Sequence, residues 1–413
     1  MSQEIEDLSY PKDQIKVLLL EGIHPKAIEN FNQNGFYNVE THDVAFSEEE
    51  LLEKIEDVQL IGIRSKTQIT KKVIKKASKL KAIGCFCIGT NQVDLKAATL
   101  DGITVFNSPY SNTRSVAELV IAESIMLMRR ISLRDKEAHK GVWLKDAKES
   151  YEVRGKKIGI IGYGHIGSQV SVLAENMGFD VFYYDIEPKL PMGNATRVDS
   201  LKELLTISDI VTLHVPATPD THMMIGKEEL AQMKERSFLL NLARGSVVEI
   251  DALKEAIESG HIAGAGIDVY PEEPESKGEK FTSELQNLPN VILTPHIGGS
   301  TLEAQYNIGL DVSTKLIKLI DNGTTVDSHT VPSLNLPVQK DAHRILHIHE
   351  NKPGVLSEVN SCLSNMDINI LGQYLKTNEY IGYVVLDIDK DYNDQVLDEL
   401  SKVKHTIKTR ILY

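Results

Sequence analysis

Short apolar segments alternate with amphipathic segments along most of the chain. The first hundred or so residues contain four apolar runs of strand length, and the segments between them read as helices. Strands that alternate with helices in this way are typical of parallel α/β sheets. We therefore predict strands at 15–20, 59–63, 81–87 and 103–107.

Two of the predicted helices begin with a capping-box pattern, in which a serine and a glutamate three residues later bond each other's backbone N–H. Ser47 and Glu50 open the segment "SEEELLEKIEDV", and Ser115 and Glu118 open a long apolar helix at about 115–130. We expect both pairs to form capping boxes.

A second series of strands lies between residues 156 and 296, and a helix at about 300–321 follows it. The strand segments are "KKIGIIG", "DVFYYD", "DIVTLHV", "SFLLNLA", "IAGAGIDV" and "NVILTPH". Six strands separated by helices predict a doubly wound, Rossmann-type parallel sheet. It is inserted into the α/β domain formed by the first strand series.

The end of the chain has a different order. Residues 322–342 carry two prolines and little apolar periodicity, as in a linker. From residue 343 to 413 the order is strand, helix, strand, strand, helix, strand. This βαββαβ order is the ferredoxin-like pattern.

Composition limits the class of protein. A chain of 413 residues with 41% hydrophobic and 25% charged residues is expected to form two or three soluble domains. Its net charge of −14 disfavours nucleic-acid binding, and neither a signal peptide nor a membrane span is evident. Cys85, Cys87 and Cys362 show no CxxC spacing, so we expect no metal site and a reducing, cytoplasmic location.

A glycine fingerprint follows the strand "KKIGIIG". Gly162, Gly164 and Gly167 have the spacing G-x-G-x-x-G at the start of a helix, and Asp185 closes the next strand. The first glycine makes the tight turn, the second lets a pyrophosphate approach the backbone, and the third lets helix and strand pack closely. Asp185 would bind the adenosine ribose and repel a 2′-phosphate. The pattern predicts NAD binding in preference to NADP.

Three polar residues end other strands of the same domain. Arg244 lies in "NLARGSVV", Glu273 in "DVYPEEP" and His296 in "LTPHIGGST". Ligands of open α/β sheets bind at the carboxyl ends of strands. Oxidation of an alcohol needs a base for the hydroxyl proton, and an imidazole beside a carboxylate fits that task near neutral pH. Together the three residues predict a hydride-transfer site.

The segments "GYGHIG", "NLARG", "DVYPEEP" and "LTPHIGGST" together resemble the D-isomer-specific 2-hydroxyacid dehydrogenases over residues 10–325. The segments "GCFCIGTNQVDL" and "FNSPYSNTRSVAE", with the C-terminal unit, narrow the match to members that act on D-3-phosphoglycerate and carry an ACT regulatory domain. The resemblance implies a flavodoxin-like substrate-binding domain, an NAD-binding domain, a linker and the ACT domain. Their ranges are 1–110 with 299–325, 111–298, 326–342 and 343–413.

The resemblance also implies residue roles. Arg244 binds the substrate carboxylate, His296 is the general acid/base, and Glu273 is its partner. Glu273 is chosen over Glu272 because the family places the acid immediately before proline. The remaining cofactor-binding residues are Gly162, Gly164, His165, Ile166, Gly167, Asp185, Leu242, Ala243, Asp268, Ile297, Gly298 and Gly299, with Arg244 and His296 shared.

For the substrate, the resemblance implies Arg64 and Lys66 at the phosphate, the turn Gly89-Thr90-Asn91 at the carboxylate, and Lys145 from a neighbouring subunit. Two positions depart from the family pattern. Many relatives have arginine at position 66, and lysine gives a point charge rather than a bidentate fork. Leu242 is bulkier than the small residue common in relatives.

The ACT-like tail implies that L-serine is an effector, held by His349, Asn351 and Asn369 at a seam between two such domains. A homo-oligomer, a dimer of dimers, is the family expectation. Two alternatives stay open at this point: another NAD-dependent D-2-hydroxyacid dehydrogenase, and an NAD-sensing corepressor built on the same fold.

Overall fold

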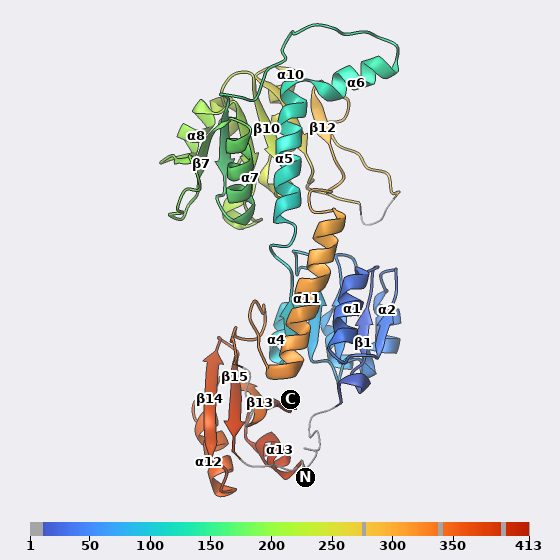
Figure 1. Ribbon diagram of the computed structural model, residues 1–413, viewed down its shortest axis with the longest axis vertical. Coiled ribbons are helices and arrows are strands. Elements are labelled where there is room, and N and C mark those ends of the chain that lie inside the picture. Colours follow the sequence, from blue (N-terminus) through green and yellow to red (C-terminus); the bar gives the residue numbers. More distant parts are fainter. Residues whose placement is uncertain (1–10, 275–277, 338–341, 390–393, 413) are drawn as a thin grey trace. The chain divides into compact units, whose positions relative to one another are not determined.

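The computed structural model describes residues 11–274, 278–337, 342–389 and 394–412 (Figure 1). The chain divides into two compact units, one of residues 112–304 and one of residues 1–111 with 305–413. Parts of four predicted ranges lie outside the described residues, namely 1–10, 275–277, 338–341 and 390–393, as does residue 413. The division of the first unit into substrate-binding, linker and regulatory segments stays a prediction.

The first unit begins with a five-stranded parallel sheet of order β2-β1-β3-β4-β5, which is the flavodoxin-like order. Helix α11 (Leu302–Asn322) contributes Ile308, Val312 and Leu316 to the core on one face of this sheet. The elements are β1 (Val17–Leu19), α1 (Pro25–Gln33), β2 (Val39–Thr41), α2 (Glu48–Lys54), β3 (Leu60–Ile63), α3 (Lys71–Lys76), β4 (Ala82–Cys85), α4 (Leu95–Leu100) and β5 (Thr104–Phe106).

The second unit is a seven-stranded parallel sheet of order β12-β11-β10-β9-β6-β7-β8, with a separate apolar core on each face. Helices α5 and α7 pack side by side against one face (Figure 1). The strands are β6 (Lys157–Ile161), β7 (Asp180–Tyr184), β8 (Thr196–Arg197), β9 (Ile210–Leu213), β10 (Ser237–Asn241), β11 (Ile262–Ile267) and β12 (Val291–Leu293). The helices are α5 (Thr113–Met128), α6 (Ile131–His139), α7 (His165–Asn176), α8 (Leu201–Ile207), α9 (Lys227–Gln232) and α10 (Ile250–Glu258).

This fold confirms the predicted doubly wound sheet, with two differences. Strands β2 and β8 were not predicted, because they are two or three residues long, half-exposed or exposed, and lack an apolar run. The capping box of Ser47 and Glu50 is confirmed. The one predicted for Ser115 and Glu118 is wrong, because α5 begins at Thr113 and Glu118 pairs with Arg114 instead.

The tail has the predicted βαββαβ order and forms an antiparallel sheet, β14-β15-β13-β16. One face packs on its two helices, and the other buries residues of the preceding segment such as Val331 and Leu336. The elements are β13 (His343–Glu350), α12 (Val355–Asn365), β14 (Ile370–Thr377), β15 (Ile381–Ile388), α13 (Asp394–Lys402) and β16 (Thr406–Leu412).

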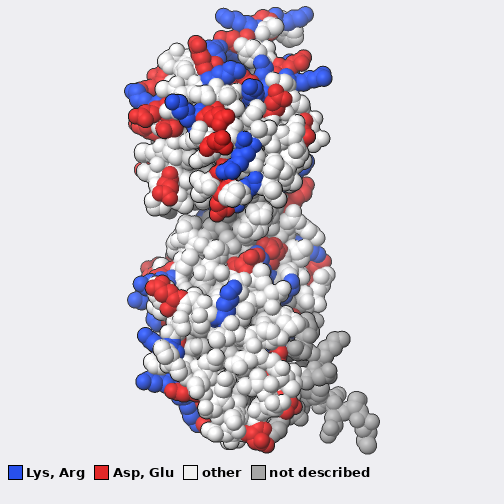
Figure 2. All heavy atoms as spheres, turned by 90° about the vertical axis from the view of Figure 1, so that its left-hand side faces the viewer, with Lys and Arg blue, Asp and Glu red and all other residues white. Residues whose placement is uncertain are grey.

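The segment before the tail is irregular but packed. Thr330 donates its hydroxyl to the carbonyl of Ile103 and accepts the N–H of Val105. On the face drawn in Figure 2, acidic and basic side chains are interspersed. Among the described residues, every helix is too short or too polar to cross a membrane.

Candidate active site

The glycine fingerprint has the geometry that dinucleotide binding needs. Gly162 has a φ of +89°, and a methyl group there would stand 2.5 Å from the carbonyl oxygen of His214. A methyl group on Gly167 would stand 2.1 Å from the carbonyl oxygen of Gly162, so this helix can pack here only on a glycine. At Gly164, the N-cap of α7, a methyl group would meet nothing within 4 Å. The second glycine therefore leaves an approach to the helix N-terminus, where a pyrophosphate binds.

Asp185 follows the neighbouring strand, β7, and shapes the same edge. Its carboxylate accepts the N–H of Tyr163 at 2.8 Å and the N–H of Glu187 at 2.9 Å. The acid thus orders the glycine turn as well as presenting a negative charge at the strand end.

His296 and Glu273 are hydrogen-bonded. The Nδ1 atom of His296 lies 2.7 Å from Oε2 of Glu273, and Oε1 of Glu273 accepts the N–H of Tyr270 at 3.0 Å. The second carboxylate contact fixes the rotamer of Glu273, which in turn fixes the plane of the imidazole. The bond to Nδ1 leaves Nε2 as the ring nitrogen available for proton exchange with a ligand.

His296 and Glu273 shift each other's pKa toward the charged forms, imidazolium and carboxylate. The hydrogen bond to Glu273 raises the pKa of His296 above its ordinary value, although burial acts in the opposite sense. Burial alone would raise the pKa of Glu273, but the bonds from His296 and from the Tyr270 N–H hold it below the ordinary value. Arg244 acts on both groups through its charge, lowering each pKa.

Asp268 holds the histidine loop in place. Its side chain is 1% exposed and accepts three hydrogen bonds, from the hydroxyl of Thr294 at 2.6 Å, from the N–H of Ile297 at 2.8 Å and from the N–H of Gly298 at 2.7 Å. His296 itself has a φ of +53°, a conformation that non-glycine residues seldom adopt. The Asp268 bonds on both sides of His296 stabilise it.

The glycine pair after His296 serves the same loop. A methyl group on Gly298 would stand 2.9 Å from Oδ2 of Asp268, and one on Gly299 would stand 2.2 Å from Nδ2 of Asn112. The absence of side chains there accommodates two polar groups of the second unit.

Arg244 lies at the end of β10 on a loop that packs against the Glu273 loop. A methyl group on Gly245 would stand 1.9 Å from the carbonyl carbon of Tyr270. The guanidinium donates Nη1–H to the carbonyl of Ala243 at 2.7 Å, and Asn241 donates to the carbonyl of Arg244. Leu242 and Ala243, named from the sequence, are buried beneath this turn.

The cations named for the substrate lie on a loop that one buried acid organises. The carboxyl group of Glu21 accepts the N–H groups of four successive residues, 64 to 67, at 2.9 to 3.1 Å. Arg64 is half-buried and Lys66 is exposed. The sequence did not single out Glu21, because a glutamate after an apolar strand looks like any solvated acid.

The other predicted substrate residues lie at the surface or near it. Gly89 and Thr90 are half-buried and Asn91 is exposed, in the turn after β4. Lys145 is exposed in the segment that follows α6, two residues after Trp143, whose exposed fraction is 84%.

The predicted effector residues lie at two ends of the tail sheet. His349 is on β13, 4% exposed, and Asn351 follows that strand and donates to the carbonyl of Asn378. Asn369 lies beside Asp389, at the far end of β13 and β15. One chain therefore separates Asn351 from Asn369 by the length of a strand, about 25 Å.

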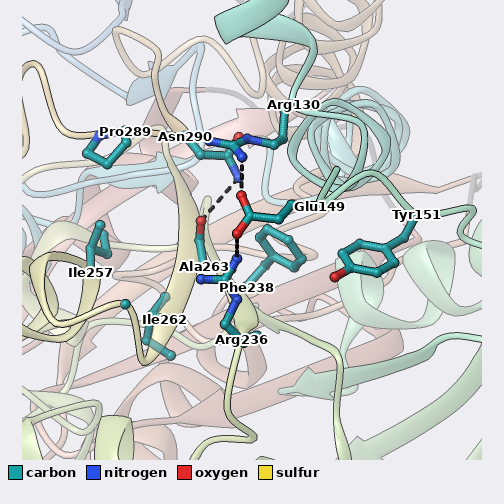
Figure 3. Close-up of a pocket in the computed structure, with 11 residues that line it drawn as sticks. Arg130, Glu149, Tyr151, Arg236, Phe238, Ile257, Ile262, Ala263, Pro289 and Asn290 are labelled. Atoms are coloured by element: carbon teal, nitrogen blue, oxygen red, sulfur yellow. Dashed lines mark hydrogen bonds and ion pairs between the residues drawn. The ribbon is translucent and has the colours of Figure 1, made fainter. Parts of the chain in front are cut away.

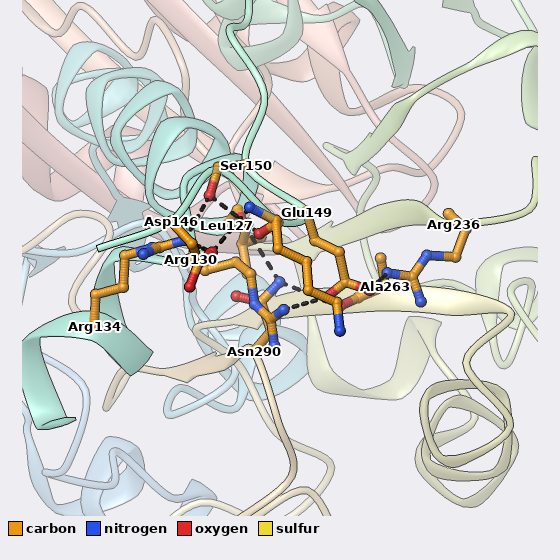
Figure 4. A network of polar contacts seen from close by, with 10 residues as sticks. Leu127, Arg130, Arg134, Asp146, Glu149, Ser150, Arg236, Ala263 and Asn290 are labelled. Atoms are coloured by element: carbon orange, nitrogen blue, oxygen red, sulfur yellow. Dashed lines mark hydrogen bonds and ion pairs between the residues drawn. The ribbon is translucent and has the colours of Figure 1, made fainter. Parts of the chain in front are cut away.

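A small cavity of about 150 Å³ lies at the end of the second sheet where β10 and β11 begin (Figure 3). This is the end opposite to the one that carries the glycine fingerprint. There Glu149 bridges Arg130 and Arg236, and Asn290 donates to the carbonyls of Leu127 and Ala263 (Figure 4). The Arg130–Glu149 pair thereby joins the start and the end of the segment that carries Trp143 and Lys145. No group of three or more potential metal ligands occurs among the residues that the structure describes.

Comparison with known proteins shows what this chain is similar to. Residues 121–298 match the model of the D-isomer specific 2-hydroxyacid dehydrogenase NAD binding domain, and residues 345–408 match the AHAS small subunit-like ACT domain. The chain is 52% identical, over 408 residues, to D-3-phosphoglycerate dehydrogenase of Escherichia coli (strain K12). That alignment covers 98% of this chain and 99% of the relative.

Solved structures agree on the fold. The TT0316 protein from Thermus thermophilus matches with a TM-score of 0.68 and 31% identity, covering 76% of this chain and all of that one. D-lactate dehydrogenase from Aquifex aeolicus, solved with NAD and lactic acid, matches with a TM-score of 0.66 and 26% identity. It covers 77% of this chain and 100% of its own.

Proposed function

The chain belongs to the D-isomer-specific 2-hydroxyacid dehydrogenase family, and we propose that it oxidises D-3-phosphoglycerate to 3-phosphohydroxypyruvate with NAD, the entry step to serine biosynthesis. The observation that carries the chemistry is the 2.7 Å bond between His296 and Glu273 at the edge that holds the glycine fingerprint. The substrate rests on the 52% identity to the Escherichia coli enzyme over nearly the whole chain.

Gly164, the start of α7 and Asp185 would hold NAD, which would supply the hydride acceptor. His296 takes the hydroxyl proton at Nε2 while the carbon–hydrogen bond breaks. Glu273 stabilises the imidazolium that results, because its carboxylate lies on the opposite ring nitrogen. In the reverse direction, the same imidazolium returns the proton to the ketone oxygen.

We assign the two anionic groups of the substrate, the carboxylate and the phosphate, to cationic residues of the chain. Arg244 binds the carboxylate, with the Gly89-Thr90-Asn91 turn, and Arg64 and Lys66 bind the phosphate. Glu21 supports this assignment in one respect. Its carboxyl group already occupies the N–H groups of residues 64 to 67, so a phosphate at this loop would bind side chains rather than backbone.

Assembly and regulation extend the proposal. We propose a homo-oligomer, a dimer of dimers in the cytoplasm, as the family resemblance implies. The exposed apolar side chains of Val142, Trp143 and Leu144 on one segment support a contact between chains there. L-serine would bind the tail at a seam between two chains. The separation of Asn351 from Asn369 in a single chain favours a site that takes one residue from each copy.

The test is a panel of initial rates. The purified chain is assayed for NADH formation with D-3-phosphoglycerate, D-glycerate and D-lactate, and with NADP in place of NAD. The proposal expects turnover of the phosphorylated acid with NAD to exceed the others by orders of magnitude. Equal rates with D-lactate would assign the chain to another 2-hydroxyacid dehydrogenase. NAD binding without turnover of any acid would favour an NAD-sensing corepressor.

A further inference from the structure

Glu123 is an acidic residue in the middle of α5 that the proposed chemistry does not use. It is 1% exposed, and neither of its carboxyl oxygens has a hydrogen-bond partner among the described residues. Buried polar groups are nearly always hydrogen-bonded, so an unpaired carboxyl group in a core needs a specific reason.

Helix α5 presses this carboxyl group against the strand that delivers Asp268. A methyl group on Gly266 of β11 would stand 2.4 Å from Oε2 of Glu123. Asp268 lies two residues beyond Gly266. Two turns earlier on the same face of α5, Val116 lies 3.5 Å from the point that a methyl group on Gly298 would occupy. One face of α5 therefore runs from Glu123 to the loop that Asp268 holds.

The two carboxyl groups differ in their surroundings. Asp268 accepts three hydrogen bonds, and Glu123 accepts none. When two buried carboxyl groups lie close together, one keeps a proton, and it is the one without donors. In agreement with this, burial raises the pKa of Glu123 to about 8, and the charge of Asp268 makes a smaller contribution in the same direction.

Few other ionisable groups face Glu123. Strands β10 and β12 contribute none, and α7 buries only Gly167, Val170, Ser171 and Ala174. Tyr270 is the remaining neighbour. Burial raises its pKa, with Asp268, Glu123 and Glu273 adding to the effect, so it stays neutral throughout the working range. Beyond Asp268 lie Glu273 and His296.

We propose that Glu123 is a positioning residue, which keeps its proton at neutral pH so that Asp268 remains the single negative charge holding the loop of His296. Ionisation of Glu123 would place a second negative charge beside Asp268, with no donor to receive it. The Asp268 bonds to Thr294, Ile297 and Gly298 then weaken, and the loop loosens. The role of Glu123 in catalysis rests on the proposed function of His296.

The experiment compares wild type, Glu123→Gln and Glu118→Gln across a pH range centred on 8. Glu118 lies on the same helix, with a side chain 60% exposed, and is the matched control. NADH affinity is measured by fluorescence, and the protection of residues 294–298 by amide hydrogen exchange. In wild type and in Glu118→Gln, affinity should fall above pH about 8, by up to about tenfold per pH unit. Loop protection should fall in parallel.

Glu123→Gln cannot ionise, so both quantities should lack this transition. The same transition in Glu123→Gln as in wild type, or no transition in wild type, would overturn the proposal.

If Glu123→Gln does not fold, infrared spectroscopy of wild type decides. Because burial raises the pKa of Glu123 to about 8, a protonated-carboxyl band should be present at pH 7 and vanish well above pH 8. Its absence at pH 7 would also overturn the proposal. None of these readouts needs turnover, so failure of the proposed function would appear separately, as NADH binding without oxidation of phosphoglycerate.

Discussion

At the scale of single residues, the pairing of His296 with Glu273 sets the direction of the pH dependence. The carboxylate raises the pKa of His296. Oxidation needs neutral imidazole, so its rate should rise as pH increases through this raised pKa. Reduction needs imidazolium, so its rate should fall over the same range.

Glu273→Gln removes the largest cause of that shift. The pKa of His296 should fall, and the acid limb of kcat/KM for oxidation should move to lower pH, while the maximal rate drops because the imidazolium loses its stabilising charge. Profiles of kcat/KM against pH in both directions measure this. A limb at the same pH in both proteins would show that another group controls the titration.

Glu21 gives a second residue-scale prediction. Its carboxyl group orders residues 64 to 67, and Gln would put an amide N–H against their N–H groups. Glu21→Gln should raise KM for D-3-phosphoglycerate by about tenfold or more, equivalent to about 1.4 kcal/mol, with a smaller effect on NADH affinity. Glu48→Gln, which alters a carboxyl group bonded to Thr70 and Lys72, is the control. A similar rise in both variants would remove the loop from substrate binding.

At the scale of the elements, the three glycines between β6 and α7 differ in what they do. Gly164→Ala should fold normally, because its methyl group meets nothing within 4 Å, yet bind NADH weakly because that space is the approach to the helix. Gly167→Ala should lose roughly 1–3 kcal/mol of unfolding free energy, since its methyl group overlaps the carbonyl of Gly162. Thermal unfolding and NADH titration of both variants separate the two effects. Equal losses of stability would contradict this division.

Much of this element-level organisation could be predicted, because long apolar runs and the glycine spacing report directly on buried strands and a tight turn. The predictions that were wrong or missing concern the start of one helix and a very short strand. Ser115 and Glu118 have the spacing of a capping box, but α5 starts two residues earlier, so Glu118 meets Arg114. Strand β8 has no apolar run because both of its residues are exposed.

The candidate site shows the same limit. The motifs predicted roles for His296, Glu273, Arg244 and Asp268. They could not show that Asp268 holds the histidine loop, nor that Glu21 and Glu123 lie buried, because a single glutamate in a sequence carries no mark of burial.

At the scale of the whole molecule, the tail is a packed part of the first unit and shares a core with the segment that precedes it. Residues of the preceding segment, such as Val331 and Leu336, share a core with Leu346 of β13 and Leu412 of β16. Truncation near Asp327 would remove this core entirely, together with the contacts that Thr330 makes with Ile103 and Val105, so point variants are the better test of regulation.

Asn351→Ala and Asn369→Ala should each abolish inhibition by L-serine, whereas Asn365→Ala, an exposed residue at the end of α12, should not. If two chains share each effector site, a mixed oligomer of the first two variants regains sites in which both asparagines are present. Inhibition should then partly return on mixing. No inhibition of wild type by millimolar serine would assign the tail to assembly or to another ligand.

The central claim is that this chain transfers hydride from D-3-phosphoglycerate to NAD while His296 takes the proton. The most direct measurement is the rate of NADH formation by wild type and by His296→Asn, with the NADH affinity of each determined separately. The account predicts rapid turnover by wild type, unchanged NADH affinity in the variant, and a loss of kcat of about 100-fold or more. Turnover by His296→Asn near the wild-type rate, or none by wild type, would contradict it.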